Sequence, residues 1–178
     1  MKKTFMAVLM ILLWTAVSVA AADLKVGDSA GGFKLKDPNG VEYSLDSPRY
    51  QGKVVVVFYA DPGSKDLNND LQNALKAARE TGKIDKNNYE GLGVVNVKDS
   101  ILPNFLLRSV IKSKQEETKA VILIDPDYIV LNQWGLTRKT SNIIMLDKQR
   151  ACRYIYKGKV PQEDIAKVIA LVQEYQVK

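Results

Sequence analysis

The sequence predicts an α/β protein in which helices flank a central mixed β-sheet and a β-hairpin precedes the main strands. One observation is the apolar run at residues 54–60, whose four consecutive valines indicate a strand buried on both faces. The other is the alternation of helix-like and strand-like apolar patterns that follows this run. Strands that alternate with helices place a sheet between helical layers.

The N-terminal hairpin is predicted over residues 33–45. Apolar and polar residues alternate at both ends of this stretch, which is typical of strands with one buried face. Between the two ends, residues 37–40 read Asp-Pro-Asn-Gly. Asn-Gly tolerates the positive backbone angles that a tight reversal needs, so the two alternating segments should pair.

A first helix is predicted to follow the central strand directly. Asp61 is expected to cap it, and Pro62 occupies the first helical position, where its missing N–H costs nothing. The helix should end near Gly82. Its expected apolar face comprises Leu67, Leu71, Ala74, Leu75 and Ala78.

Later elements follow the same alternation. Strands are predicted at residues 91–97, 120–125, 142–147 and 153–156, the last two forming a closing hairpin. Helices are predicted to begin at Pro103 and Pro161. The stripes expected to face the sheet comprise Leu106, Leu107, Val110 and Ile111 in the first of these helices and Ile165, Val168, Ile169 and Val172 in the second.

Residues 1–22 have the features of a secretory signal peptide. Two lysines precede an apolar run, which ends in small residues that place cleavage after Ala20, Ala21 or Ala22. The apolar run is too short for a stable membrane span, so we expect it to be removed rather than to anchor the protein. The sequence thus predicts export to the periplasm and one domain over residues 23–178.

Composition excludes several kinds of chemistry. The chain has no histidine, which removes the usual general base and the commonest zinc ligand, and we expect neither a metal nor a cofactor. Its single cysteine, Cys152, has no partner for an intramolecular disulfide. The formal net charge is +6, of which the leader contributes two lysines. An exported protein does not meet chromosomal DNA, so the remaining charge predicts either a solvated surface or contact with an anionic surface.

The order of these elements resembles the thioredoxin-like fold, and within it the peroxiredoxin and TlpA-type branch. The segments that carry the resemblance are residues 26–28, 33–40, 52–60, 125–136 and 144–148. A closer resemblance is to the YtfJ-like family of small exported bacterial proteins, carried by residues 95–103, Arg108-Ser109 and the tail from 146 to 172. The resemblance implies a thioredoxin-like fold across nearly all of residues 23–178.

The chain departs from this resemblance at the redox site. Redox-active relatives carry Cys-x-x-Cys or a peroxidatic cysteine in the turn after the central strand, where a helix N-terminus stabilises the thiolate. Here that turn is residues 61–66 and has no thiol. The second landmark, a cis-proline or an arginine, falls on Ser141. The resemblance therefore implies a non-catalytic binding or scaffolding module rather than a thioredoxin or a peroxiredoxin.

The expected contact surface for a protein or peptide partner combines two turns that meet at one edge of this fold. The residues assigned to this candidate binding edge are Asp61, Pro62, Ser64, Lys65, Thr140 and Ser141. Ser64 and Lys65 are the other polar groups of the first turn. A serine nucleophile there would have only Lys65 or a carboxylate as its base, so a solvated hydroxyl and ammonium are the more typical interpretation. The helix N-terminus could bind an anion or a peptide carboxylate.

Cys152 supports an alternative function. Arg150 and Arg153 flank it and could lower the pKa of its thiol, as a one-cysteine thiol oxidoreductase or peroxidase-like enzyme would need. The other interpretation is a small buried apolar residue.

Two charged groups also allow two interpretations each. Asp61, Asp66 and Asp70, with Asn68 or Asn69, could bind Ca²⁺ through oxygen, or could simply favour the N-terminus of a helix; no calcium-loop spacing is present. Basic residues in the last third could form a patch for an anionic partner, or could be ordinary solvated edges. They are Arg138, Lys139, Lys148, Arg150, Arg153, Lys157 and Lys159.

Overall fold

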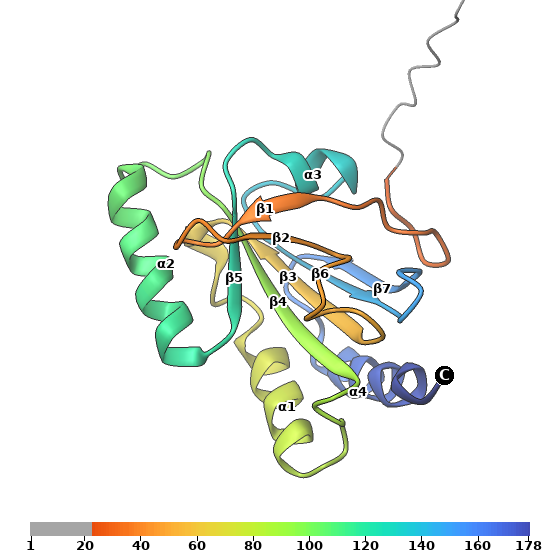
Figure 1. The fold of residues 1–178 in the computed structure, drawn as a ribbon. Coiled ribbons are helices and arrows are strands. Elements are labelled where there is room, and N and C mark those ends of the chain that lie inside the picture. Colours follow the sequence, from red (N-terminus) through yellow and green to blue (C-terminus); the bar gives the residue numbers. More distant parts are fainter. Residues whose placement is uncertain (1–22) are drawn as a thin grey trace, which may run out of the picture.

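The computed structural model describes residues 23–178 (Figure 1), and the predicted leader at 1–22 lies outside the described residues. Its centre is a seven-stranded mixed sheet in the order β2-β1-β5-β4-β3-β6-β7. The strands are β1 (Lys34–Lys36), β2 (Glu42–Ser44), β3 (Val54–Ala60), β4 (Tyr89–Asn96), β5 (Val121–Asp125), β6 (Ser141–Leu146) and β7 (Cys152–Lys157). The prediction of a mixed central sheet is confirmed.

Strand β3 is the core of the sheet. It runs parallel to β4 and antiparallel to β6, and its four valines are fully buried. Val55 and Val57 pack with Trp134 on one face, whereas Val54 and Val56 pack on the other. Burial on both faces explains why the strand is continuously apolar.

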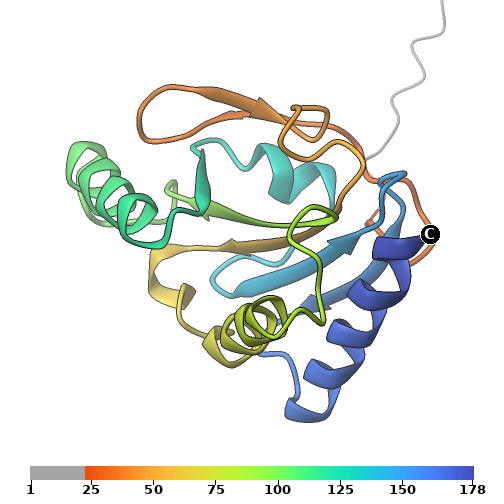
Figure 2. The ribbon, with the colours of Figure 1, turned by 60° about the horizontal axis from the view of Figure 1, so that its bottom comes forward.

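Helices cover the sheet unequally (Figure 2). The helices α1 (Asn69–Glu80), α2 (Asn104–Thr118) and α4 (Gln162–Val177) lie on one face, and the short α3 (Ile129–Gln133) lies on the other. No helix within residues 23–178 has both the length and the apolar character needed to cross a membrane.

The N-terminal hairpin forms as predicted, with Leu35 opposite Tyr43. The Asp37 carboxylate accepts hydrogen bonds from the backbone N–H groups of Asn39 and Val41, both at 2.9 Å, which closes the turn. Gly40 has a φ of +87°, the left-handed conformation that the Asn-Gly pair was expected to supply.

The first helix begins later than predicted. Asp61 makes no capping hydrogen bond; a short 3₁₀ turn, η1 (Pro62–Ser64), follows it, and the α-helix starts only at Asn69. The physical reason is Asn68, the residue before the helix. Its side chain is hydrogen-bonded to β6 and to the segment after β7. That attachment fixes where the helix begins and leaves Leu67 36% exposed rather than buried.

Helix α2 begins after Pro103 as predicted, but only half of its expected stripe is buried. Leu107 and Ile111 pack against Ile124 of β5, whereas Leu106 and Val110 are 44% and 59% exposed. The helix covers the sheet through a single narrow face, so the prediction that all four residues contact the core is wrong.

Candidate functional site

The structure brings the two turns of the predicted binding edge together. The antiparallel register of β3 and β6 pairs Ala60 with Ser141, so the turn that starts at Asp61 lies directly beside Thr140. Of the predicted residues, Ser141 is unavailable to a ligand because it is 3% exposed and its hydroxyl accepts a hydrogen bond from Asn68 at 2.9 Å.

Asn68 holds this edge together. Besides its bond to Ser141, its amide nitrogen donates to the Gly158 carbonyl at 3.0 Å, and its amide oxygen accepts the Val160 N–H at 2.8 Å. The side chain is 3% exposed. Because its hydrogen-bonding groups face the protein, Asn68 is a structural link rather than a calcium ligand.

The carboxylates of this turn do not converge. Asp66 forms an ion pair with Lys65, and Asp70 lies 3.9 Å from the ammonium group of Lys159. Residues 23–178 contain no group of three or more carboxylate or thiol side chains placed to hold a metal ion. The geometry thus gives no support to the calcium alternative. The Lys65 ammonium is ion-paired with Asp66, so Lys65 is not a free base beside Ser64.

A groove of about 450 Å³ opens beside the Asp61 turn. Asp61, Pro62 and Gly63 line one side, and residues 99–102 line the other. The Oδ1 atom of Asp61 is inaccessible and has no hydrogen-bond partner among the described residues. Because this atom is buried, a ligand in the groove does not reach it. Asp61 as a whole is only partly buried and lines the groove, so its carboxylate still contributes an acceptor there.

The far wall of the groove rests on a polar cluster around Asp99. This carboxylate accepts hydrogen bonds from the Tyr128 hydroxyl at 2.7 Å and from the Asn96 amide at 2.9 Å, and it forms an ion pair with Arg138. The guanidinium of Arg138 also lies 4.9 Å from the centre of the Tyr128 ring. The cluster joins the loops after β4 and β5 to the segment before β6.

Sequence reasoning missed this cluster. Arg138 was assigned to a basic patch, and Asp99 and Tyr128 were given no role. A signal was available, because β4 and β5 are parallel neighbours and the carboxyl ends of parallel strands meet at one sheet edge. Polar residues directly after two such strands are therefore expected to meet.

The Asp99 cluster is expected to make the free energy of unfolding depend on pH. Hydrogen bonds from Arg138 and Tyr128 hold the pKa of the Asp99 carboxyl well below its usual range. A depressed folded-state pKa adds stability above the unfolded pKa, about 4, and this stability is lost as the pH falls through the folded value. The difference in unfolding free energy between wild type and Asp99→Asn is therefore expected to be larger at neutral pH than in acid.

Urea unfolding at several pH values measures this difference. Asp127→Asn is the matched control, because the Asp127 carboxylate is 70% exposed and contacts only Lys98 at 3.4 Å. Its effect on stability should stay small throughout. If the difference in unfolding free energy between wild type and Asp99→Asn does not change with pH, the ion-paired Asp99 carboxylate does not stabilise this edge.

Cys152 lies far from the groove. It begins β7 and pairs with Leu146, whereas the groove lies beyond the Ala60–Ser141 end of the sheet. The thiol is fully buried in the core, and burial raises its pKa to about 11. The flanking arginines do not offset this burial, so the structure favours the interpretation of Cys152 as a small apolar residue.

Thiol labelling tests this assignment. In the native protein we expect Cys152 to react with an aromatic disulfide reagent at least about a hundredfold more slowly than in urea, because reaction needs the exposed thiolate. The released thiolate chromophore gives the rate. Rapid, stoichiometric labelling of the folded protein would instead support the one-cysteine alternative.

The seven basic residues considered for an anionic partner do not gather in one place. The β6–β7 hairpin sends its members to opposite ends, with Arg138, Lys139, Lys157 and Lys159 at the groove end and Lys148, Arg150 and Arg153 at the other. Several also have partners: Arg150 donates to four backbone carbonyls, and Arg153 pairs with Asp147 at 2.7 Å. Neighbours in sequence are separated here because a hairpin places its turn far from its open end.

Together, this fold and this edge define a thioredoxin-like protein whose turn after the central strand carries no cysteine. A candidate protein disulfide isomerase from Bacteroides thetaiotaomicron has a TM-score of 0.65 and 15% identity, over 87% of this chain and 92% of that one. The exposed lipoprotein thioredoxin Etrx1 of Streptococcus pneumoniae has a TM-score of 0.57 and 18% identity, over 79% and 99%. These likenesses confirm the thioredoxin-like fold.

The chain belongs to the family described as "Bacterial protein of unknown function (YtfJ_HI0045)", whose model matches residues 17–175. An uncharacterized protein of Haemophilus influenzae is 27% identical over 97% of both chains. The uncharacterized protein YtfJ of Escherichia coli is 25% identical over 84% of this chain and 82% of its own. The resemblance to the YtfJ-like family is thus confirmed.

Proposed function

We propose that this protein is an exported, non-catalytic binding module that holds a polypeptide segment in the groove beside the Asp61 turn. In this account residues 1–22 are removed on export, and residues 23–178 act as one domain in the periplasm or at the cell envelope. One structural neighbour, Etrx1, is described as an exposed lipoprotein, which is consistent with a fold that works outside the cytoplasm.

The observation that carries the proposal is the composition of the groove. The turn carries no thiol, whereas a groove lined by the Asp61 carboxylate and three apolar residues is present. Pro62, Ile101 and Leu102 offer apolar contact, and Asp61 offers an acceptor. An extended polypeptide supplies both complements, because its backbone N–H groups alternate with side chains.

Peptide binding tests the proposal. Ten-residue peptides with a central apolar side chain are expected to bind the mature chain, measured by fluorescence anisotropy. Asp61→Ala and Leu102→Asp should each weaken binding about tenfold, the cost of one lost contact of roughly 1.4 kcal/mol. Val41→Asp is the control, since Val41 is 50% exposed at the distant hairpin turn. Binding that both groove variants leave unchanged would contradict the proposal.

A further inference from the structure

Five large apolar side chains stand exposed around the start of α2. We call this set the α2 apolar patch; it comprises Ile101, Leu102, Phe105, Leu106 and Val110. Ile101 is 99% exposed, Phe105 71% and Val110 59%. Leu106 and Val110 are four residues apart and share one helix face. Phe105 lies on the adjacent face, three residues before Arg108. An exposed patch of this kind usually marks an interaction surface.

The position of α2 leaves this patch free. Only Leu107 and Ile111 contact the core, and the helix lies at the flank of the molecule (Figure 1). The patch side chains therefore project outward. Phe105 and Val110 do not line the groove, so the patch extends beyond the site proposed above for polypeptide binding.

The charge around the patch is positive. Arg108 and Lys112 are exposed and one turn apart on α2, and Lys98 precedes the patch. The first turn of α2 contains no acidic residue. The only carboxylate between residues 98 and 115 is Asp99, which is ion-paired with Arg138 and only 9% exposed. Lys98 pairs with the exposed Asp127 at 3.4 Å, so Arg108 and Lys112 are the cations that share this surface with the apolar side chains.

We propose that the α2 apolar patch docks on the surface of an anionic phospholipid bilayer. An apolar stripe with cations beside it is the pattern of helices that lie in a membrane interface, where apolar side chains enter the acyl region and cations meet phosphate. A second copy of the chain fits less well, because a two-fold contact through α2 would oppose the cations of the two copies. An acidic polypeptide would match the charge, but Phe105 and Val110 protrude from α2 and do not line the groove.

Vesicle binding tests the apolar part of this inference. The mature chain should co-sediment with phosphatidylglycerol-containing vesicles and not with pure phosphatidylcholine. Phe105→Ser combined with Val110→Ser should weaken binding at least about tenfold, because both lose buried apolar area. Val41→Ser, which removes an apolar side chain outside the patch, should bind as wild type does. Thermal melting confirms that each variant is folded.

Variants that remove single charges distinguish electrostatic attraction to the vesicles from nonspecific hydrophobic adsorption. Arg108→Ser and Lys112→Ser should each weaken binding about fivefold at low salt, the contribution of one cation near an anionic surface. Lys86→Ser, an exposed lysine in the loop before β4, is the control. Molar salt should weaken wild-type binding and reduce the effect of both α2 variants.

A fluorescent reporter locates the contact. Phe105→Trp adds an exposed indole, while Trp134 is buried and gives a constant background. Its emission should shift to the blue on adding phosphatidylglycerol vesicles. The inference is overturned if no vesicle binds, if the Phe105 and Val110 variants bind equally well, or if light scattering shows a dimer that these variants dissociate. Peptide binding at the groove can survive any of these results.

Discussion

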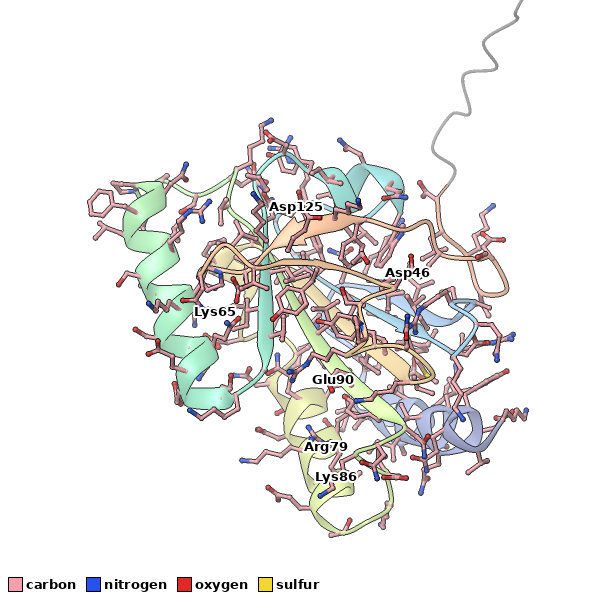
Figure 3. All side chains as sticks on the ribbon, in the orientation of Figure 1. Asp46, Lys65, Arg79, Lys86, Glu90 and Asp125 are labelled. Atoms are coloured by element: carbon pink, nitrogen blue, oxygen red, sulfur yellow. The ribbon has the colours of Figure 1, made fainter. Side chains whose placement is uncertain are left out.

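Replacing Asp125 with alanine is expected to destabilise the protein by about 3–5 kcal/mol, because two buried donors and one partly buried donor would lose their acceptor. The carboxylate is fully buried at the end of β5 (Figure 3). It accepts hydrogen bonds from the Tyr59 hydroxyl at 3.1 Å and from the N–H groups of Ile129 and Val130 at 2.7 and 3.0 Å. These bonds link β3, β5 and the start of α3.

Asp127→Ala is the matched control for this prediction. It lies two residues away, its carboxylate is 70% exposed, and its one ion pair with Lys98 spans 3.4 Å. We expect its free energy of unfolding, measured in urea, to stay within about 0.5 kcal/mol of wild type. Equal effects of the two substitutions would show that the buried network does not support this edge.

Replacing Asn68 with alanine is expected to cost about 2–4 kcal/mol of stability. The substitution leaves the Ser141 hydroxyl, the Gly158 carbonyl and the Val160 N–H without their partner. It should also loosen the Asp61 turn relative to β6, because Asn68 is the side chain that ties them. Peptide affinity at the groove is therefore expected to fall with stability.

Asn69→Ala provides the comparison. Asn69 is exposed, and its amide makes one long contact of 3.5 Å to Asp66. Chemical unfolding of the two variants isolates the contribution of burial, since the same side chain is removed at neighbouring positions. A loss below about 1 kcal/mol for Asn68→Ala would contradict its assigned role, as a typical hydrogen bond alone contributes that much.

The sequence predicts the fold well because the determinants of the sheet are local. Four valines define the central strand, Asn39-Gly40 defines the hairpin turn, and prolines mark the starts of α2 and α4. The late start of α1 was not predictable in this way. It depends on Asn68, whose partners lie 73 to 92 residues away.

The candidate site was predictable only in part. The resemblance to the thioredoxin-like fold predicts that the two turns meet. In the structure, the pairing of Ala60 with Ser141 places them side by side. The burial of Ser141 and the exposure of Leu106 and Val110 could be seen only in the packed structure. Periodicity shows which residues share a helix face, but it does not show how much of that face the sheet covers. The basic residues of the last third are divided between two places for a related reason, since a hairpin lies between them and its turn is far from its open end.

The most direct test of the central claim measures disulfide exchange and peroxide consumption by the mature chain beside Cys152→Ser. The turn beside the groove, residues 61–66, carries no cysteine, and the one cysteine of residues 23–178 is buried at the other end of the sheet. We predict that both proteins match the uncatalysed rate. Turnover by the wild type that Cys152→Ser abolishes would contradict the account and assign the redox chemistry to Cys152.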